Sequence, residues 1–477
     1  MKILFVASEL TPIAKVGGLG DVMGALPKAL THIGVEAGMV LPFYGFIPRK
    51  GARRIAHNII VRLGNSEEVI SLYETVIPNT TTPLFLVENK RYWTHGPEPY
   101  FEQTGFTGAK DEIQRFTFFS RAVFELIKLG YLKADILHCQ DWHTGALASY
   151  IARFRGELEN PKIKTIFTIH NLSNQGKWNK ADIDFWLFGS NEEPFFNAFG
   201  KDYNFIAEGI LTADYVTTVS PTYALEIQTK EYGAGLEKVI QKRSDRLVGI
   251  LNGIDYAFFN PATDPLIEQR YSYDSLNLKR VNTTAFRESS HFDDTGGPLF
   301  GFVARLTAQK SIDLIIDALE SLLPKLNAQF TFLGSGAKEY EDHLIQLAKN
   351  FPNHIRVKIG FDEALAHRIY AASDFFFMPS RFEPCGLGQM ISMRYGSVPI
   401  VRATGGLKDS VEHRKTGFVF TDSSVSALKK EILAAHELYM KKPKDLQKMQ
   451  ENGMRKNFDF ENVARAYKDL YQKVSAL

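Results

Sequence analysis

Short apolar runs alternate with helical patterns along the whole chain, and this alternation restricts the possible folds more than any other feature. Most of the runs are continuously apolar, as expected of parallel strands that are covered on both faces. Helical patterns such as 114–128, 311–323 and 338–349 lie between them. The expected strands are 3–7, 134–137, 165–169, 215–219 and 247–251 in the first half and 300–304, 330–333, 355–359, 375–378 and 398–401 in the second. The pattern predicts an α/β protein with two separate series of parallel strands.

The two strand series indicate two domains. A chain of 477 residues is too long for one hydrophobic core of ordinary size. Between the two series, residues 256–297 are polar and weakly periodic. We therefore expect doubly wound, Rossmann-like domains at 1–255 and 256–456, and a terminal helix within 457–477. In such folds ligands bind at the carboxyl ends of the strands, which we expect to face a cleft between the domains.

The charge balance and the cysteine content narrow the possible partners and compartments. The net charge of +2 arises from 56 basic and 54 acidic residues without a block of like charge, so we expect neither nucleic acid nor a membrane as a partner. The first apolar run is too short for a signal peptide, and no run approaches the roughly 18 residues of a membrane span. Only Cys139 and Cys385 could form a disulfide. A reducing, cytoplasmic location follows as the expectation.

A glycine-rich segment, Lys15-Val-Gly-Gly-Leu-Gly-Asp21, follows the first strand and precedes a helical pattern. Adjacent Gly17 and Gly18 allow backbone amides to approach an anion closely, and the helix N-terminus adds a favourable dipole. Lys15 could add a full positive charge to a phosphate. Taken alone, the pair of glycines fits a packing turn equally well.

Two cations, Arg305 and Lys310, follow the first strand of the second series. At the carboxyl end of a strand they could flank a diphosphate. The alternative is a pair of solvated surface charges, which is the commoner situation for these residue types.

Glu383 lies in the segment Ser380-Arg-Phe-Glu-Pro-Cys-Gly-Leu-Gly388, directly after an apolar strand. A carboxylate at this sheet edge could accept hydrogen bonds from sugar hydroxyls or stabilise a positive anomeric carbon. The alternative is an acid that caps the following helix. No nearby His or Asp indicates a nucleophilic role for Cys385, so a packed thiol is the favoured interpretation.

Polar and aromatic residues follow two expected strands of the first domain. One segment is His138-Cys-Gln-Asp-Trp-His143, and the other begins at His170. Hydrogen-bonding side chains and an aromatic face are what a carbohydrate site requires. A metal site of His138, Asp141 and His143 is conceivable, but no further ligand completes it, so we expect no metal.

Together, and in this order, these motifs resemble those of bacterial glycogen synthase and plant starch synthase. These enzymes are retaining glycosyltransferases of the two-domain GT-B fold. The resemblance extends from residue 15 to the closing segment 458–471. It includes the segments 219–227, 252–255, 305–310, 380–387 and 404–407.

The resemblance implies roles for individual residues in binding the donor. Arg305 and Lys310 match the diphosphate pair, and Glu383 matches the acid that contacts the donor glucose. The remaining donor positions are Lys15, Gly17 and Gly18 in the nucleotide-sugar loop, Asp21 close to the donor, Phe361 against the base, and the amides of Cys385, Gly386, Leu387 and Gly388 around glucose and phosphate.

Further roles concern the sugar and the acceptor. His170 matches the essential histidine beside the anomeric carbon, while Asp141 and Asn252 match residues that contact the sugar. Tyr100, Trp142 and His143 fall on the acceptor side. The last helix of the family returns to the first domain, so we expect the same of residues 460–474.

The implied activity is transfer of glucose from ADP-glucose to the non-reducing end of an α-1,4-glucan, with retention of configuration and no cofactor. Alternatives are a related enzyme with UDP-glucose or a small acceptor, and an inactive glucan-binding protein. The retained cations argue against the latter, because binding a neutral polymer requires no diphosphate site. Departures from the family are Asn174 in place of Tyr, Ala207-Glu208 where a lysine is common, and Gly388 in place of Thr.

Overall fold

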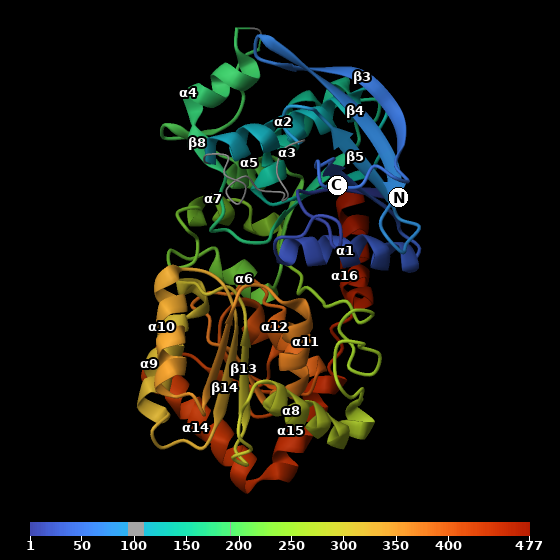
Figure 1. Cartoon of the computed structure of the whole chain (residues 1–477). Helices are drawn as coiled ribbons and strands as arrows, with labels where there is room; N and C mark the ends of the chain where they lie inside the picture. Colours follow the sequence, from blue (N-terminus) through green and yellow to red (C-terminus); the bar gives the residue numbers. More distant parts are fainter. Residues whose placement is uncertain (94–108, 191) are drawn as a thin grey trace. The chain divides into compact units, whose positions relative to one another are not determined.

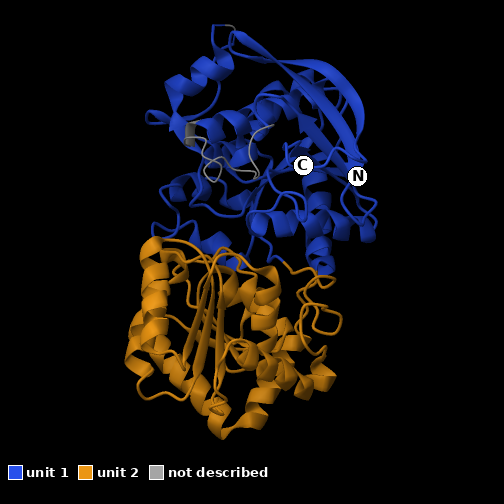
Figure 2. Cartoon of the chain, in the orientation of Figure 1, with its two compact units in different colours: residues 1–252, 460–477 blue, residues 253–459 orange. Residues whose placement is uncertain are grey.

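The computed structural model describes residues 1–93, 109–190 and 192–477 (Figure 1). The chain forms two compact units (Figure 2). Unit 1 comprises Met1–Asn252 and Phe460–Leu477, and unit 2 comprises Gly253–Asp459. The division therefore falls at Asn252, slightly before the boundary expected after Asp255, and the terminal helix belongs to unit 1.

Unit 1 is built on a nine-stranded sheet with the order β12-β11-β7-β6-β1-β2-β5-β4-β3. The strands are β1 (Lys2–Val6), β2 (Glu36–Pro42), β3 (Arg53–Leu63), β4 (Ser66–Val76), β5 (Pro83–Glu88), β6 (Ile136–Gln140), β7 (Lys164–Ile169), β11 (Tyr215–Thr218) and β12 (Leu247–Gly249). Pairing is parallel from β12 to β5 and antiparallel from β5 to β3. The antiparallel part was not predicted, because buried and exposed residues are mixed along β3 and β4 instead of forming a continuous apolar run.

Helices cover the sheet of unit 1. They are α1 (Gly18–His32), α2 (Ala109–Lys128), α3 (Gly145–Phe154), α4 (Lys180–Ile183), α5 (Phe205–Thr212), α6 (Pro221–Glu226), α7 (Glu237–Gln241) and α16 (Phe460–Ser475). Helix α16 lies beside α1 (Figure 1). Its buried residues recur at helical spacing and include Tyr467 and Tyr471. This apolar stripe explains why the terminal helix packs onto the sheet of unit 1.

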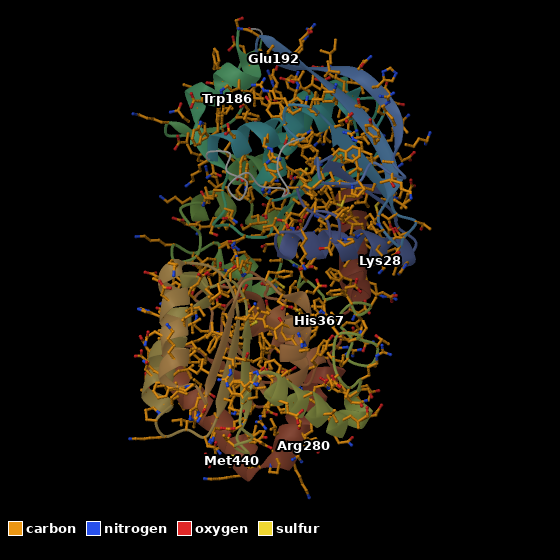
Figure 3. The ribbon with its side chains drawn as sticks, in the orientation of Figure 1. Lys28, Trp186, Glu192, Arg280, His367 and Met440 are labelled. Atoms are coloured by element: carbon orange, nitrogen blue, oxygen red, sulfur yellow. The ribbon has the colours of Figure 1, made fainter. Side chains whose placement is uncertain are left out.

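A small three-stranded sheet extends unit 1. It consists of β8 (Lys177–Asn179), β9 (Ala198–Phe199) and β10 (Asp202–Asn204) beside α4 and the π-helical turn Asp184–Phe188. Arg121 of α2 holds this region through two hydrogen bonds of 2.9 and 3.1 Å to the carboxylate of Glu192, which Figure 3 labels. The Arg121 side chain is 9% exposed and that of Glu192 is 32% exposed, and the paired geometry strengthens the contact.

Unit 2 contains a six-stranded, fully parallel sheet with the order β15-β14-β13-β16-β17-β18. The strands are β13 (Leu299–Val303), β14 (Gln329–Gly334), β15 (Ile355–Ile359), β16 (Phe375–Met378), β17 (Val398–Arg402) and β18 (Phe418–Phe420). The helices are α8 (Lys279–Ser289), α9 (Ile312–Leu322), α10 (Lys338–Asn350), α11 (Glu363–Ala372), α12 (Gly388–Arg394), α13 (Gly405–Ser410), α14 (Val425–Lys441) and α15 (Pro443–Arg455). The predicted α/β class with parallel strands is confirmed in both units.

The polar segment between the two strand series is ordered by buried polar contacts. Helix α8, which the sequence did not predict, buries Lys279, whose ammonium donates to the Ala371 carbonyl at 2.5 Å at the end of α11. In the same segment Asp264 accepts hydrogen bonds from Tyr395 at 2.5 Å and from His367 at 2.7 Å. Figure 3 labels His367. Polar residues thus form part of the core here, and for this reason the apolar pattern of the sequence did not predict the segment's structure.

None of the helices within the described ranges is both long enough and apolar enough to cross a membrane.

Candidate active site

The glycine-rich loop joins β1 to α1 in unit 1. An added methyl group at Gly17 or Gly18 would have no atom of the described structure within 4 Å, whereas one at Gly24 would lie 2.8 Å from the Thr11 carbonyl oxygen. The fold itself therefore requires no glycine at 17 or 18. This open space fits an approaching ligand better than the packing turn that the sequence left as an alternative. Lys15 lies 2.7 Å from the Asp21 carboxylate.

Glu9 shapes this loop, a role that no sequence motif predicted. Its buried Oε2 accepts hydrogen bonds from the amides of Val16 at 2.8 Å and Gly17 at 2.7 Å. One of the amides that we expected around a phosphate, that of Gly17, is therefore bound to a carboxylate of the protein. The loop is held in place before any ligand arrives, and the later amides at the start of α1 are left to face an anion.

Asp141 follows β6 in an unusual backbone conformation, with φ 54° and ψ −175°. Such a conformation costs a residue with a side chain about 1–3 kcal/mol and persists only where surrounding contacts hold it. Here the Asp141 amide donates to the Thr168 carbonyl at 2.9 Å, and Oδ1 accepts the His170 amide at 2.7 Å. Parallel pairing of Gln140 with Thr168 brings the two strand ends together.

Burial raises the pKa of Asp141 to about 7. The amides of His170 and Asn171 oppose this shift by stabilising the carboxylate, while the nearby charge of Glu9 reinforces it. The carboxylate of Asp141 is therefore poised to change its charge near neutral pH.

His170 follows β7, and its ring is half-buried. The ring Nε2 lies 2.8 Å from Oε1 of Gln140. Burial keeps the pKa of the imidazole below its ordinary value, so the ring is neutral at physiological pH. The structure thus brings Asp141 and His170 to one edge of the sheet, as the strand pattern predicted.

His138 does not belong to this group. Strand β6 extends to Gln140 and includes His138, which the sequence placed beyond the strand. Its ring nitrogens lie 2.6 Å from Thr168 Oγ1 and 2.9 Å from the hydroxyl of Tyr471 on α16. Both nitrogens are engaged, so the ring cannot bind the metal considered with Asp141 and His143. Within the described part of the chain, no cluster of three or more His, Cys, Asp or Glu side chains could hold a metal ion.

Trp142 and His143 are packed side chains rather than an open aromatic surface. Their ring centroids are 4.2 Å apart, and both rings contact Phe116 edge-on. A methyl group at Gly176 would lie 2.4 Å from the Trp142 ring, so this glycine permits the packing. Tyr100, the third residue expected on the acceptor side, lies outside the described residues.

In unit 2, Lys310 and Glu383, which come from separate sequence motifs, are in direct contact. The Lys310 ammonium lies 2.5 Å from Glu383 Oε2, which also accepts a hydrogen bond from Ser380 Oγ at 2.9 Å. Glu383 is 5% exposed. Arg305, in contrast, is exposed and has no ion pair with any described residue. The carboxyl ends of β13 and β16 therefore carry one neutralised pair and one available cation.

Two arginines hold the loop that carries Glu383. Arg402, at the end of β17, donates from Nε to the Ser380 carbonyl at 2.9 Å and from Nη2 to the Arg381 carbonyl. Arg381 forms a two-pronged ion pair with Asp313 on α9 and donates its amide to the Gln309 carbonyl at 2.9 Å. Side chains from neighbouring elements thus fix the position of the buried carboxylate.

A second pair of glycines packs against the same loop. A methyl group at Gly405 would lie 1.9 Å from the Glu383 carbonyl oxygen, and one at Gly406 would lie 2.2 Å from that of Cys385. These glycines permit backbone segments to touch, unlike Gly17 and Gly18. At Gly388, an added methyl would lie 3.0 Å from Met378 Sδ, a contact with a flexible side chain that a small shift relieves.

The other expected donor residues differ in their surroundings. Phe361 follows β15 and is 82% exposed, so its ring has no apolar packing to account for it. Cys385 and Cys139 are both buried, and they form no disulfide with each other. Asn252 is 5% exposed, and its Oδ1 has no hydrogen-bond partner among the described residues. A buried acceptor without a donor is costly, and either an ordered water or a ligand hydroxyl would satisfy it.

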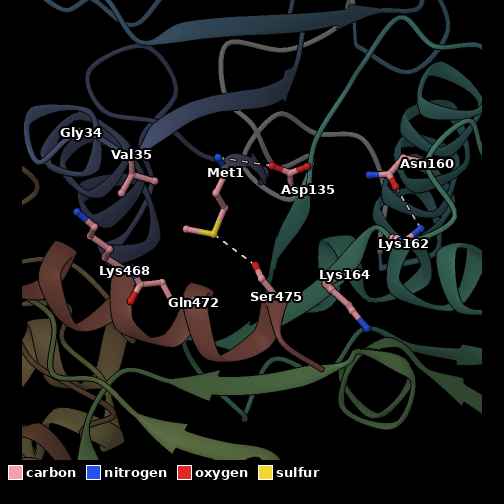
Figure 4. A pocket seen from close by; sticks show the side chains of 10 residues that line it. All are labelled: Met1, Gly34, Val35, Asp135, Asn160, Lys162, Lys164, Lys468, Gln472 and Ser475. Atoms are coloured by element: carbon pink, nitrogen blue, oxygen red, sulfur yellow. Dashed lines mark hydrogen bonds and ion pairs between the residues drawn. The ribbon is translucent and has the colours of Figure 1, made fainter.

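A cavity of about 730 Å³ lies elsewhere in unit 1, at the amino ends of β1 and β7 (Figure 4). It is lined by residues such as Asp135, Lys164 and Lys468. The Lys468 ammonium donates to the Ile33 carbonyl at 3.3 Å, and the side chain of Lys164 points away from Lys468. These cations do not converge, and the candidate residues lie at the opposite ends of the strands.

Residues 2–242 match the family described as starch synthase catalytic domain, and residues 284–456 match glycosyl transferases group 1. The glycogen synthase of Thermodesulfovibrio yellowstonii is 38% identical over 493 residues, which cover 99% of this chain and 97% of the relative. Glycogen synthase 2 of Nitrosococcus oceani is 40% identical over 488 residues, with the same coverage.

Solved structures agree with these matches. The catalytic domain of starch synthase IV from Arabidopsis thaliana, bound to ADP and acarbose, has a TM-score of 0.87 and 32% identity, covering 100% of this chain and 99% of that one. Sucrose-phosphate synthase from Thermosynechococcus elongatus has a TM-score of 0.62 at 15% identity and shares the fold, again covering 100% and 99%.

The two doubly wound units and these likenesses define a glycosyltransferase of the GT-B fold. Within that class, the chain belongs to the glycogen synthase and starch synthase family, whose members match it over nearly its whole length. The chain is accordingly a hexosyltransferase, as the motifs predicted.

Proposed function

We propose that the chain transfers glucose from ADP-glucose to the non-reducing 4-hydroxyl of an α-1,4-glucan, with retention of the anomeric configuration. Similarity to glycogen synthases over 99% of the chain supports the acceptor. The Arabidopsis relative bound to ADP supports the donor base.

The contact between Lys310 and Glu383 carries the proposal. Transfer of a sugar from a nucleoside diphosphate creates a positive anomeric carbon and a negative leaving group. A buried carboxylate stabilises the first, and an adjacent ammonium stabilises the second. The ion pair holds both groups together before substrate binds, so neither side chain has to move into position during the reaction.

The remaining donor residues receive roles consistent with their surroundings. Arg305 supplies to the diphosphate a cation that has no ion pair with any described residue. Lys15, which lies 2.7 Å from the Asp21 carboxylate, supplies a second cation from the open loop at Gly17 and Gly18. Phe361 stacks on the nucleobase, and Asn252 contacts the sugar. The amides of Cys385, Gly386, Leu387 and Gly388 hold glucose and phosphate.

Asp141 and His170 complete the assignment on the sugar side. The ionised carboxylate of Asp141 screens the positive charge that develops on the glucose ring, and the neutral His170 accepts a hydrogen bond from a sugar hydroxyl. Trp142 and His143 support the acceptor side of the site. Tyr100, which lies outside the described residues, is assigned to the same side. A chain with only two cysteines, both buried and not joined in a disulfide, favours a cytoplasmic location.

The decisive experiment incubates the protein with glycogen and radiolabelled ADP-glucose or UDP-glucose, then measures label in the precipitated polymer. We expect incorporation from ADP-glucose and much less from UDP-glucose. Glu383→Gln, which preserves the shape of the side chain, should lose at least about 100-fold in kcat. Absence of label from the polymer with either donor would contradict the proposed acceptor, and label only from UDP-glucose would support the alternative donor.

A further inference from the structure

Gln140 lies between two histidines at the carboxyl end of β6. Its side chain is 1% exposed. On one side its Nε2 donates to the His138 carbonyl oxygen at 3.2 Å, and on the other its Oε1 lies 2.8 Å from Nε2 of His170. The amide nitrogen of Gln140 thus faces the backbone of His138, and the amide oxygen faces the ring of His170.

The His138 carbonyl determines which way the amide of Gln140 is oriented. A carbonyl oxygen can only accept, so the edge of the amide that faces it must be the NH2 group. The opposite edge is then the oxygen, which can only accept as well. His170 Nε2 must therefore carry a proton, because two acceptors facing each other in a buried place would be unfavourable.

The protonation of Nε2 also determines the state of the second ring nitrogen of His170, Nδ1. A neutral imidazole carries one proton, so a protonated Nε2 leaves a lone pair on Nδ1. No hydrogen bond to Nδ1 is formed by any described residue. The ring is half-buried, so this acceptor is accessible to a ligand at the edge where Asp141 lies.

We propose that Gln140 is a positioning residue that holds His170 in the Nε2-protonated form and thereby presents Nδ1 as an acceptor to a sugar hydroxyl of the donor. The inference rests on the proposed function for the identity of the ligand, although the protonation state itself does not. The residue acts through His170 and touches no substrate. Without the Gln140 oxygen, the ring is free to protonate Nδ1, which then cannot accept.

The test uses the full chain labelled with ¹⁵N at histidine and compares wild type with Gln140→Met, a side chain of similar length without polar edges. The chain has 12 histidines, so the His170 signals are assigned by their loss in His170→Gln. We expect wild-type His170 to show a protonated Nε2 and an unprotonated Nδ1. Gln140→Met should show a mixture of the two neutral forms.

Gln329→Met is the matched control. Gln329 is also fully buried, donates to the Asp293 carbonyl at 2.7 Å and accepts from Arg287 Nε at 3.0 Å, but it lies in unit 2. Its loss should lower stability to a similar degree and leave the His170 signals and kcat unchanged. A purely structural effect of removing a buried glutamine would affect both variants alike.

Kinetics provides the second readout. Gln140→Met should lose about three- to tenfold in kcat, the equivalent of one oriented hydrogen bond, with a smaller change in the KM for the glucan. A wild-type spectrum with the proton on Nδ1 overturns the inference even if the variant does not fold. So does a variant that keeps both the wild-type spectrum and the wild-type kcat. Wild type without glucosyl transfer would reject the proposed function while the spectrum still decides the protonation state.

Discussion

The Lys310 ammonium lies 2.5 Å from Oε2 of Glu383, and both side chains are largely removed from water. Removing one member leaves an unpaired buried charge, so Lys310→Met and Glu383→Gln should each destabilise the protein by about 3 kcal/mol. The double variant removes both charges and should recover much of this loss. Urea unfolding measures the stabilities, and all three variants should lack transfer activity. Equal stability of the single and double variants would contradict a buried ion pair.

Asp141 should give activity and stability opposite dependences on pH. If its ionised form screens the glucose ring, and its pKa is about 7, activity rises about tenfold between pH 6 and pH 8. The unfolded carboxyl titrates near 3.8, so the folded state retains a proton that the unfolded chain has released. The contribution of Asp141 to stability is therefore complete below pH 3.8 and lost as the pH rises through about 7.

Asp141→Asn is the reference for both measurements, because its amide oxygen can still accept the His170 amide. The variant should be weakly active and lack both pH dependences. An activity profile of the wild type that is flat between pH 6 and pH 8 would show that Asp141 does not act as an ionised group.

The two glycine pairs should respond differently to alanine. Gly406→Ala places a methyl group against the Cys385 backbone and should cost about 2–3 kcal/mol. Gly18→Ala meets open space, so its stability should change by less than about 0.5 kcal/mol, while the KM for the donor rises. Gly156→Ala, which also meets open space, is the control and should alter neither quantity. An unchanged donor KM in Gly18→Ala would argue against a ligand at this loop.

Phe361→Ala tests the stacking of the nucleobase. The ring is 82% exposed, so its removal should leave the melting temperature unchanged. Loss of aromatic stacking on a base is worth about 1–3 kcal/mol, so the KM for ADP-glucose should rise at least about fivefold. Phe185→Ala, which removes another exposed ring in unit 1, should leave this KM unchanged.

Ser311→Gly should stabilise the protein. Ser311 precedes α9 in the left-handed region, with φ 56°, and its buried hydroxyl has no hydrogen-bond partner among the described residues. Glycine removes both the steric cost and the unsatisfied hydroxyl, for a gain of about 1 kcal/mol in the free energy of unfolding. Ser311→Val should do the reverse. Thermal unfolding distinguishes the two variants.

The sequence by itself determined the parallel strand series and the placement of the motifs at strand ends. These are local properties, since a continuous apolar run and the charged or glycine residues that follow it can be recognised without knowing their neighbours. Asp141 and His170 could be placed together for this reason, because parallel strands share the edge at which they end. The antiparallel strands β3 and β4 and the polar helix α8 carry no such local signal.

Only the tertiary structure decided which residues support these motifs and what each glycine pair does. Glu9 on the glycine-rich loop, Gln140 on His170 and Arg402 behind Glu383 are contacts between side chains and segments brought together by sheet pairing and loop packing. The same sequence, Gly-Gly, marks open space at residues 17 and 18 and tight backbone contact at 405 and 406. A sequence records the identity of a residue, whereas the distance to its spatial neighbours arises only when the chain has folded.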